Sequence, residues 1–135
     1  NMLPSTGTVF VSVNDSDKLE ILNVARDFFE LGFNLIGTEG TATVLKKNGL
    51  PSRQVFKVGE GRPNIVDEIK NKKISLVINT PMGSRSRYDE QEIGRSCIRY
   101  GILAVTTLSG ANAVLRAIRS SSDSKKVQSL QEYYS

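Results

Sequence analysis

The sequence predicts an α/β domain: a three-layer sandwich in which helices cover both faces of a five-stranded parallel sheet. Five short apolar or β-branched runs alternate with five segments of helical periodicity. A β-α order repeated along a chain is typical of parallel strands joined by right-handed crossovers. The 135 residues, of which 39% are hydrophobic, suit one compact domain with a core of its own.

The first strand and the first helix are predicted near the amino terminus. Thr8–Val13 (TVFVSV) is a β-branched apolar run suited to a buried strand. In the segment that follows, Asp17 and Glu20 have the spacing of a capping box, and Gly32 is a natural helix stop. The second strand is predicted over Phe33–Ile36.

The middle of the chain alternates in the same way. A helix over 41–49 ends at an Asn-Gly pair, and the polar run 52–58 predicts a third strand near the sheet edge. A short helix is expected after Pro63. Ile74–Asn79 (ISLVIN), the most hydrophobic of the five runs, is expected to be a central strand.

The last third of the chain begins with a predicted loop over 80–88. Asp89 and Glu92 form a second candidate capping box, for a helix that ends at Gly101. The fifth strand is predicted over 102–107 and the last core helix over 109–120. The domain is thus expected to span 8–120, with 121–135 forming a polar, flexible connector and a short surface helix.

The composition excludes several classes of function. Eighteen basic and 14 acidic residues give a net charge of +4, and their scattered placement favours a small anionic ligand over a nucleic acid. No apolar run is long enough for a membrane span. The single cysteine, Cys97, permits no internal disulfide and fits the cytoplasm. Without histidine, the chain has no imidazole base and no histidine metal site.

A ligand site is expected at the carboxyl edge of the sheet, where open parallel sheets bind their ligands. The turn Thr38–Thr41 (TEGT) stands between a strand and a helix, so its amides and the helix dipole would attract a phosphate. Lys18 and Lys57 would add full positive charges. The alternative is structural: Thr38 caps the helix, and Gly40 relieves a tight turn.

Other residues at this edge have the same two interpretations. Asn79, at the end of the central strand, either faces a ligand or bonds to its own loop. Lys18 either reaches a ligand or is only solvated. Each structural interpretation is stronger when taken alone, so the ligand hypothesis rests on the convergence of these residues on one edge.

The motifs of the chain resemble those of one family. They are SVNDSDK, GFNLIGTEGTATVL, KVGEGRPNIVDEIKN, VINTPMGSR, TTLSGANAV and VQSLQEYY, within roughly residues 7–133. They are similar to the carboxyl-terminal regulatory domain of the bacterial carbamoyl phosphate synthetase large subunit, which has the methylglyoxal-synthase-like, Rossmann-like fold. The resemblance implies that residues 1–7 are a linker from a preceding domain.

The resemblance also implies a function. The domain would perform no catalysis itself and would regulate an ATP-dependent, glutamine-hydrolysing synthetase of pyrimidine and arginine biosynthesis. UMP and IMP are the expected effectors, with ornithine acting nearby. No cofactor is expected in this domain, and ATP with Mg or Mn in the parent enzyme. The expected partners are the other domains of the large subunit, the small glutaminase subunit and further copies through oligomer contacts.

The matched motifs imply a role for each residue of the site. The effector phosphate would be held by Lys18, Thr38, Gly40, Thr41 and Lys57, the nucleoside would meet Ser12, Val58, Ile65, Asn79 and Thr80, and Thr106 and Thr107 would lie at the ornithine-responsive interface. Two positions depart from the family pattern. Pro81 stands where a threonine is common and offers neither hydroxyl nor N–H, and Ser109 replaces a frequent asparagine. The identity of the effector therefore does not follow.

Two other functions remain open. Methylglyoxal synthase, which acts on dihydroxyacetone phosphate, shares the fold and the phosphate turn. Its histidines and its catalytic aspartate have no counterpart in GEGRPN, and no base is expected at the edge of the sheet to remove a proton beside a carbonyl. A third interpretation is that the domain mainly supports assembly of the parent enzyme.

Overall fold

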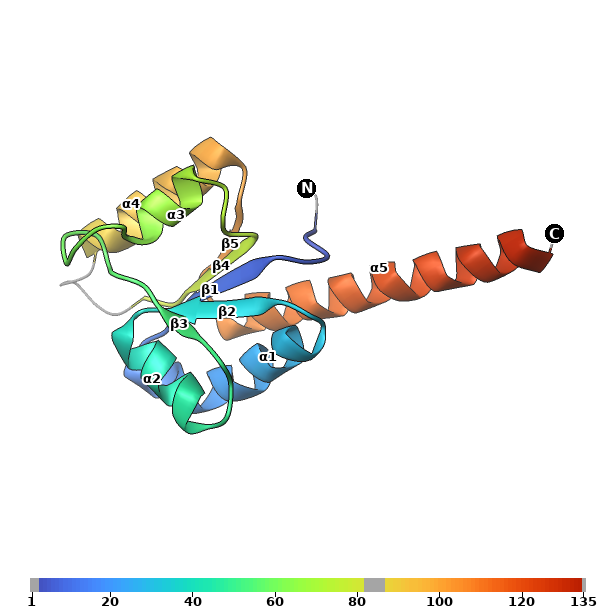
Figure 1. Ribbon diagram of the computed structural model, residues 1–135, viewed down its shortest axis with the longest axis horizontal. Helices are drawn as coiled ribbons and strands as arrows, with labels where there is room; N and C mark the ends of the chain where they lie inside the picture. The colour runs from blue at the N-terminus through green and yellow to red at the C-terminus, as the bar shows by residue number, and fades with distance from the viewer. Residues whose placement is uncertain (1–2, 82–86, 135) are drawn as a thin grey trace.

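Five parallel strands form one sheet in the order β3-β2-β1-β4-β5 in the computed structural model of this chain, which describes residues 3–81 and 87–134 (Figure 1). Of residues 87 and 122–134, only the backbone is described. The elements are β1 (Thr8–Ser12), η1 (Asp15–Asp17), α1 (Lys18–Glu30), β2 (Asn34–Gly37), α2 (Glu39–Lys47), β3 (Arg53–Gln54), α3 (Ile65–Lys70), β4 (Leu76–Asn79), α4 (Arg87–Tyr100), β5 (Leu103–Val105) and α5 (Leu108–Tyr134). The predicted α/β class is confirmed.

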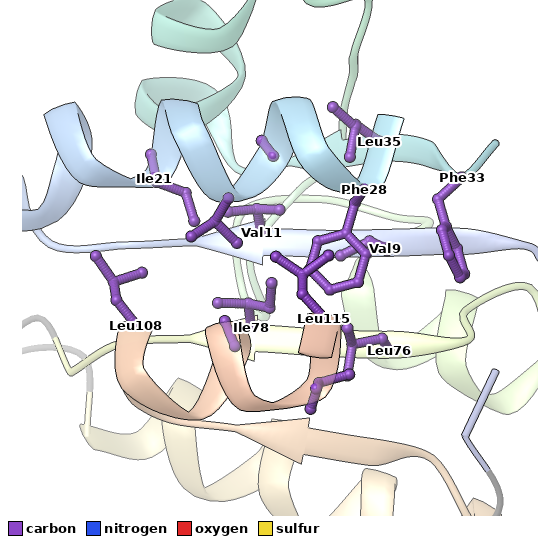
Figure 2. Packing of buried hydrophobic residues seen from close by; sticks show 14 of the residues in the cluster. Val9, Val11, Ile21, Phe28, Phe33, Leu35, Leu76, Ile78, Leu108 and Leu115 are labelled. Atoms are coloured by element: carbon purple, nitrogen blue, oxygen red, sulfur yellow. The ribbon is translucent and has the colours of Figure 1, made fainter. Parts of the chain in front are cut away.

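The sheet separates two hydrophobic cores, which makes the molecule a three-layer sandwich. Helices α1, α2 and α5 cover one face, and α3 and α4 cover the other (Figure 1). Successive side chains of a strand point to opposite faces. Val9 and Val11 of β1 therefore belong to the first core, and Phe10 belongs to the second. Figure 2 shows the first core, in which Phe28 and Leu115 lie against β1 and β4.

The strand order creates a topological switch point between β1 and β4. From β1 the chain builds β2 and β3 on one side, and it then crosses to build β4 and β5 on the other. β1 therefore occupies the middle of the sheet, and β4, predicted to be central, lies beside it. Ser12 and Asn79 are paired across these strands at their carboxyl ends. Ligands of open α/β sheets bind beyond such a point.

The third strand is at the sheet edge, as predicted, but it is much shorter than predicted. Pairing with β2 is confined to Arg53 and Gln54. The chain then leaves the sheet: Phe56 makes only an isolated bridge to Asn64, and the Lys57 amide donates to the Glu60 carboxylate at 2.8 Å. This turn takes Lys57 out of the ladder and toward the carboxyl edge.

The capping box predicted at the start of the first helix is wrong. Asp17 precedes α1 and its side chain makes no cap. The cap is supplied three residues earlier by Asn14, whose side chain accepts from the Asp17 amide and so begins the short helix η1. Both residues are good N-caps. The choice depends on where the backbone leaves the extended conformation, and Asn14 is the extended one, with φ −67° and ψ 168°.

The second predicted capping box is also wrong. Helix α4 begins at Arg87, so Asp89 and Glu92 lie within it. The predicted loop over 80–88 falls largely on residues 82–86, outside those described. A capping box that the sequence analysis missed joins Asn64 to Asp67 at the start of α3.

The prediction of a flexible connector near the carboxyl terminus is wrong as well, because α5 continues without a break from Leu108 to Tyr134. No Gly or Pro follows Gly110, and Ser, Asp and Lys lower helix stability by only about 0.7 kcal/mol or less per residue. The first turns of α5 pack against α1, and the remainder projects from the domain (Figure 1). Among the described residues, no helix combines the length and the apolar character needed to cross a membrane.

Candidate functional site

A cleft lies at the carboxyl edge of the sheet, next to the switch point. Five of the predicted site residues line it: Ser12, Thr38, Lys57, Ile65 and Asn79. They follow or end four different strands, so only the parallel arrangement brings them together. The described residues enclose a cavity of about 20 Å³, which accommodates about one water molecule. A ligand of nucleotide size would therefore lie mainly across the mouth of this edge cleft.

Thr38 occupies the N-cap position of α2, but its side chain makes no capping hydrogen bond to the helix. Thr38 is buried and extended, and its hydroxyl donates to Ser12 Oγ at 3.1 Å and makes no bond to the helix. The first amides of a helix have no partner within it. The bond from Ala42 N–H to the Thr38 carbonyl closes the first helical turn, so the amides of Gly40 and Thr41 remain available to a ligand. The structural alternative for Thr38, a helix cap, is wrong.

Lys18 lies directly beside this amide turn, which comprises Thr38 to Thr41. A Cβ atom placed on Gly40 would be 3.4 Å from Lys18 Nζ. This is an ordinary van der Waals distance, so the ammonium group lies in contact range of the start of α2. Lys18 also forms an ion pair with Asp15 of η1. The hydrogen bond and charge of Lys18 hold the pKa of the Asp15 carboxyl below its usual value.

Lys57 lies in the edge cleft with two acidic residues that the sequence analysis did not place there. Asp89 and Glu90, from the first turn of α4, line the same cleft. Burial raises the pKa of Asp89; the charge of Lys57 opposes this effect, and Glu60 and Glu90 add to it. Their place in the sequence could have indicated this position, because a helix that follows a parallel strand starts at the carboxyl edge of the sheet and both residues lie in its first turn.

Two predicted ligand contacts, Thr41 and Thr80, have structural partners. Both side chains are buried. The amide of Val13 donates to Thr41 Oγ1 at 3.2 Å, and the amide of Asn14 donates to Thr80 Oγ1 at 2.9 Å. The two hydroxyls therefore hold the loop after β1 from both sides.

Three more of the predicted site residues lie outside both the edge cleft and the amide turn. Val58 packs against the second core. Thr106 and Thr107 are exposed after β5, at an edge strand. Thr107 Oγ1 accepts from the Gly110 amide at 2.9 Å, the bond that a helix cap makes, so this hydroxyl serves the start of α5.

The arrangement suits a ligand that has an anionic group at one end and a neutral or hydrogen-bond-donating group at the other. Amides and Lys18 surround one end, while the cleft offers hydroxyl, amide and carboxylate oxygens. A carboxyl group that was not expected at this edge, that of Asp89, lines the cleft. No group of three or more acidic or cysteine side chains among the described residues is placed to hold a metal ion.

The sequence matches the family model of the MGS-like domain over residues 20–106. Curated relatives agree with this match. The chain is 48% identical over 120 residues to the carbamoyl phosphate synthase large chain of Acidobacterium capsulatum, covering 89% of this chain and 11% of that one. It is 47% identical over 132 residues to the Nostoc protein of the same name, covering 97% and 12%. This chain thus spans about a ninth of these relatives.

A shorter relative and one solved structure complete the comparison. In Aquifex aeolicus the similar protein is a carbamoyl phosphate synthase large chain, C-terminal section, with 45% identity over 138 residues that cover 98% of this chain and 26% of that one. The crystal structure of methylglyoxal synthase from Elizabethkingia anophelis superposes with a TM-score of 0.64 at 18% identity, covering 84% of this chain and 79% of that one. The latter likeness confirms the methylglyoxal-synthase-like fold.

Proposed function

This chain belongs to the family of MGS-like domains, and on that premise we propose that it is the regulatory domain of a carbamoyl phosphate synthase large chain. Its effector is a nucleoside monophosphate bound at the carboxyl edge of the sheet. Relatives that match nearly the whole chain carry that enzyme name, and one is a C-terminal section. Regulation of the parent enzyme is an inference from this kinship.

The uncapped start of α2 is the observation that supports a phosphate ligand. The amides of Gly40 and Thr41 have no side-chain cap, and Lys18 Nζ stands over the same turn. Helix amino termini carry roughly half a positive charge, which a bound phosphate complements. Asp15 neutralises part of the Lys18 charge without occupying the amides.

The rest of the nucleotide would extend from the amide turn along the edge cleft. Thr38 belongs to both, so the two parts of the site are continuous. Ile65 supplies an apolar wall, and Asn79 supplies donors and acceptors for a ribose or base. Lys57 has acidic neighbours in the cleft, so we assign it to the nucleoside side as well as to the phosphate.

In the parent enzyme, the effector would act by binding two global arrangements with different affinity. Such couplings are typically ~1–3 kcal/mol. We propose UMP and IMP as the effectors, an ornithine response through Thr106 and Thr107, and contacts with the other large-chain domains. The parent enzyme would use ATP with Mg or Mn, work with a small glutaminase subunit and reside in the cytoplasm.

Titration calorimetry of this chain with UMP and IMP tests the proposal. We expect a dissociation constant below millimolar for at least one nucleotide. Lys18→Met should weaken binding about tenfold, because a hydrogen bond to a charged group contributes about 1.5 kcal/mol or more. Lys46→Met is the matched control: Lys46 is exposed in the last turn of α2, at the opposite end of the helix. Absence of binding, or equal effects of the two variants, would refute the phosphate site.

Asp89 provides a specific reason to test a second function. A carboxyl group with a raised pKa beside a phosphate site is suited to general base catalysis, which a methylglyoxal-synthase-type lyase requires. Incubation with dihydroxyacetone phosphate and an assay for methylglyoxal would separate the two functions. Turnover that Asp89→Asn abolishes would establish the lyase and overturn a purely regulatory role.

A further inference from the structure

The loop after β1 contains one residue, Asn14, that bonds to both halves of the proposed site. Its side-chain oxygen accepts from Ser16 Oγ at 2.7 Å and from the Asp17 amide at 3.0 Å. Its side-chain amide donates to the Pro81 carbonyl at 3.0 Å. The first pair of bonds orders η1, which leads directly into Lys18, and the last bond holds the segment after β4.

We propose that Asn14 is a positioning residue that fixes the phosphate half of the site relative to the nucleoside half. The phosphate half is Lys18 with the amide turn, and the nucleoside half is Asn79 with the segment Thr80–Pro81. This inference rests on the proposed function. It adds that recognition of a whole nucleotide depends on a residue that touches neither end of the ligand.

The chemistry of asparagine explains why this residue type is needed. An amide side chain presents an acceptor and a donor on two separate atoms at the same reach, here the acceptor for η1 and the donor for Pro81, whereas a hydroxyl has one shorter-reaching atom for both. Proline has no N–H, so its carbonyl is the one backbone group through which this position can be held. The backbone of Asn14 strengthens the same link, since its amide donates to Thr80 Oγ1 at 2.9 Å.

Severing only the bond to Pro81 should therefore distinguish two kinds of ligand. A ligand that fills one half of the site does not depend on the distance between the halves. A ligand that spans both halves binds best when the two are already held in register, because ordering them on binding costs affinity. Inorganic phosphate is the first kind of ligand, and UMP is the second.

Asn14→Ser is the informative variant. Serine is also a good N-cap, so its hydroxyl can still accept from the Asp17 amide, while the donor to Pro81 is lost. By titration calorimetry of the 135-residue chain, we expect the affinity for UMP to fall about fivefold, the equivalent of one neutral hydrogen bond. The affinity for inorganic phosphate should change less than about twofold.

Asn48→Ser is the matched control. Asn48 ends α2 at the opposite edge of the sheet, and its side-chain amide also donates to a backbone carbonyl, that of Val44, at 2.8 Å. This variant should leave both affinities unchanged. Equal losses for UMP and phosphate in Asn14→Ser would show that Asn14 acts only as a helix cap, and no loss for either would show that the bond to Pro81 positions nothing. Both results overturn the inference.

Hydrogen exchange separates this inference from the proposed function, because it needs no ligand. The Thr80 amide donates to the Ser12 carbonyl at 2.9 Å. In Asn14→Ser its exchange should accelerate, whereas exchange of the capped Asp17 amide should not. If UMP fails to bind the wild-type chain while this exchange pattern appears, the proposed function fails and the positioning role stands. Unchanged exchange at Thr80 would overturn the positioning role itself.

Discussion

At the residue scale, two glycines of the segment IGTEG have different surroundings. A Cβ atom on Gly40 would make only an ordinary contact, 3.4 Å from the ammonium group of the flexible Lys18 side chain. Gly37 ends β2 against backbone: a Cβ atom there would lie 2.8 Å from the Val11 carbonyl oxygen. Side chains can move aside, but the middle strand of a sheet cannot, so Gly37 is the less replaceable of the two.

Gly37→Ala is therefore expected to lower the free energy of unfolding by about 1–3 kcal/mol, the usual penalty of overpacking. Gly94→Ala is the matched control, because Gly94 lies within α4 with no atom within 4 Å of its Cβ position. It should raise the unfolding free energy by about 0.5–1 kcal/mol through helix propensity. Urea denaturation measures both values, and effects of the same sign would contradict this account.

Asp89 and Asp15 should give opposite pH dependences of stability. Burial raises the pKa of Asp89 above 3.8 in the folded chain, so Asp89 loses its proton at a lower pH in the unfolded chain than in the folded one. The contribution of Asp89 to the free energy of unfolding is therefore lost as the pH rises through its pKa in the folded chain. Lys18 lowers the pKa of Asp15, so its contribution is present above 3.8 and is lost as pH falls through the folded pKa.

Urea denaturation of Asp89→Asn and Asp15→Asn between pH 3 and pH 7 tests this pair. Relative to wild type, Asp89→Asn should gain stability as pH rises, and Asp15→Asn should lose it. The sign is the measurement of interest, since both carboxyls are at least partly open to solvent, which weakens their interactions. Parallel pH profiles for the two variants would show that the assigned environments are wrong.

At the element scale, helix ends were harder to predict than helices. Gly32, in the left-handed region with φ 100°, confirms the predicted stop of α1. Helix α3 ends in the same way without a glycine. Lys72 has φ 59°, its amide donates to the Ile69 carbonyl, and the Lys73 amide donates to that of Glu68. This is the hydrogen-bond pattern of a Schellman motif, in which a lysine takes the position that glycine prefers.

Lys72→Gly is accordingly expected to stabilise the chain by up to about 1 kcal/mol, because a left-handed backbone costs a residue with a Cβ roughly that much. Thermal unfolding followed by circular dichroism would detect the rise in Tm. Lys73→Gly, one position later, is the control, since no positive φ is recorded there and glycine should destabilise it. A lower Tm for Lys72→Gly would contradict the strain assigned to this turn.

At the scale of the whole molecule, the switch point makes the site. β1 and β4 are adjacent in space yet separated in the chain by β2, β3, the short helix η1 and three α-helices. Their ends bring Ser12 beside Asn79, and α4 then returns Asp89 to the same edge. The long helix α5 covers the face of the sheet opposite to α4, where its first turns complete the core with α1 (Figure 2).

The sequence by itself determined the five β-α units, the parallel sheet and the edge at which polar residues gather, because periodicity and strand-end position are local properties of a chain. Only the tertiary structure decided the strand order, the entry of Asp89 into the cleft and the pairing of Asn14 with Thr80. Those two residues are 66 positions apart. Such a hydrogen bond depends on which strands become neighbours, and no local pattern in the sequence encodes that choice.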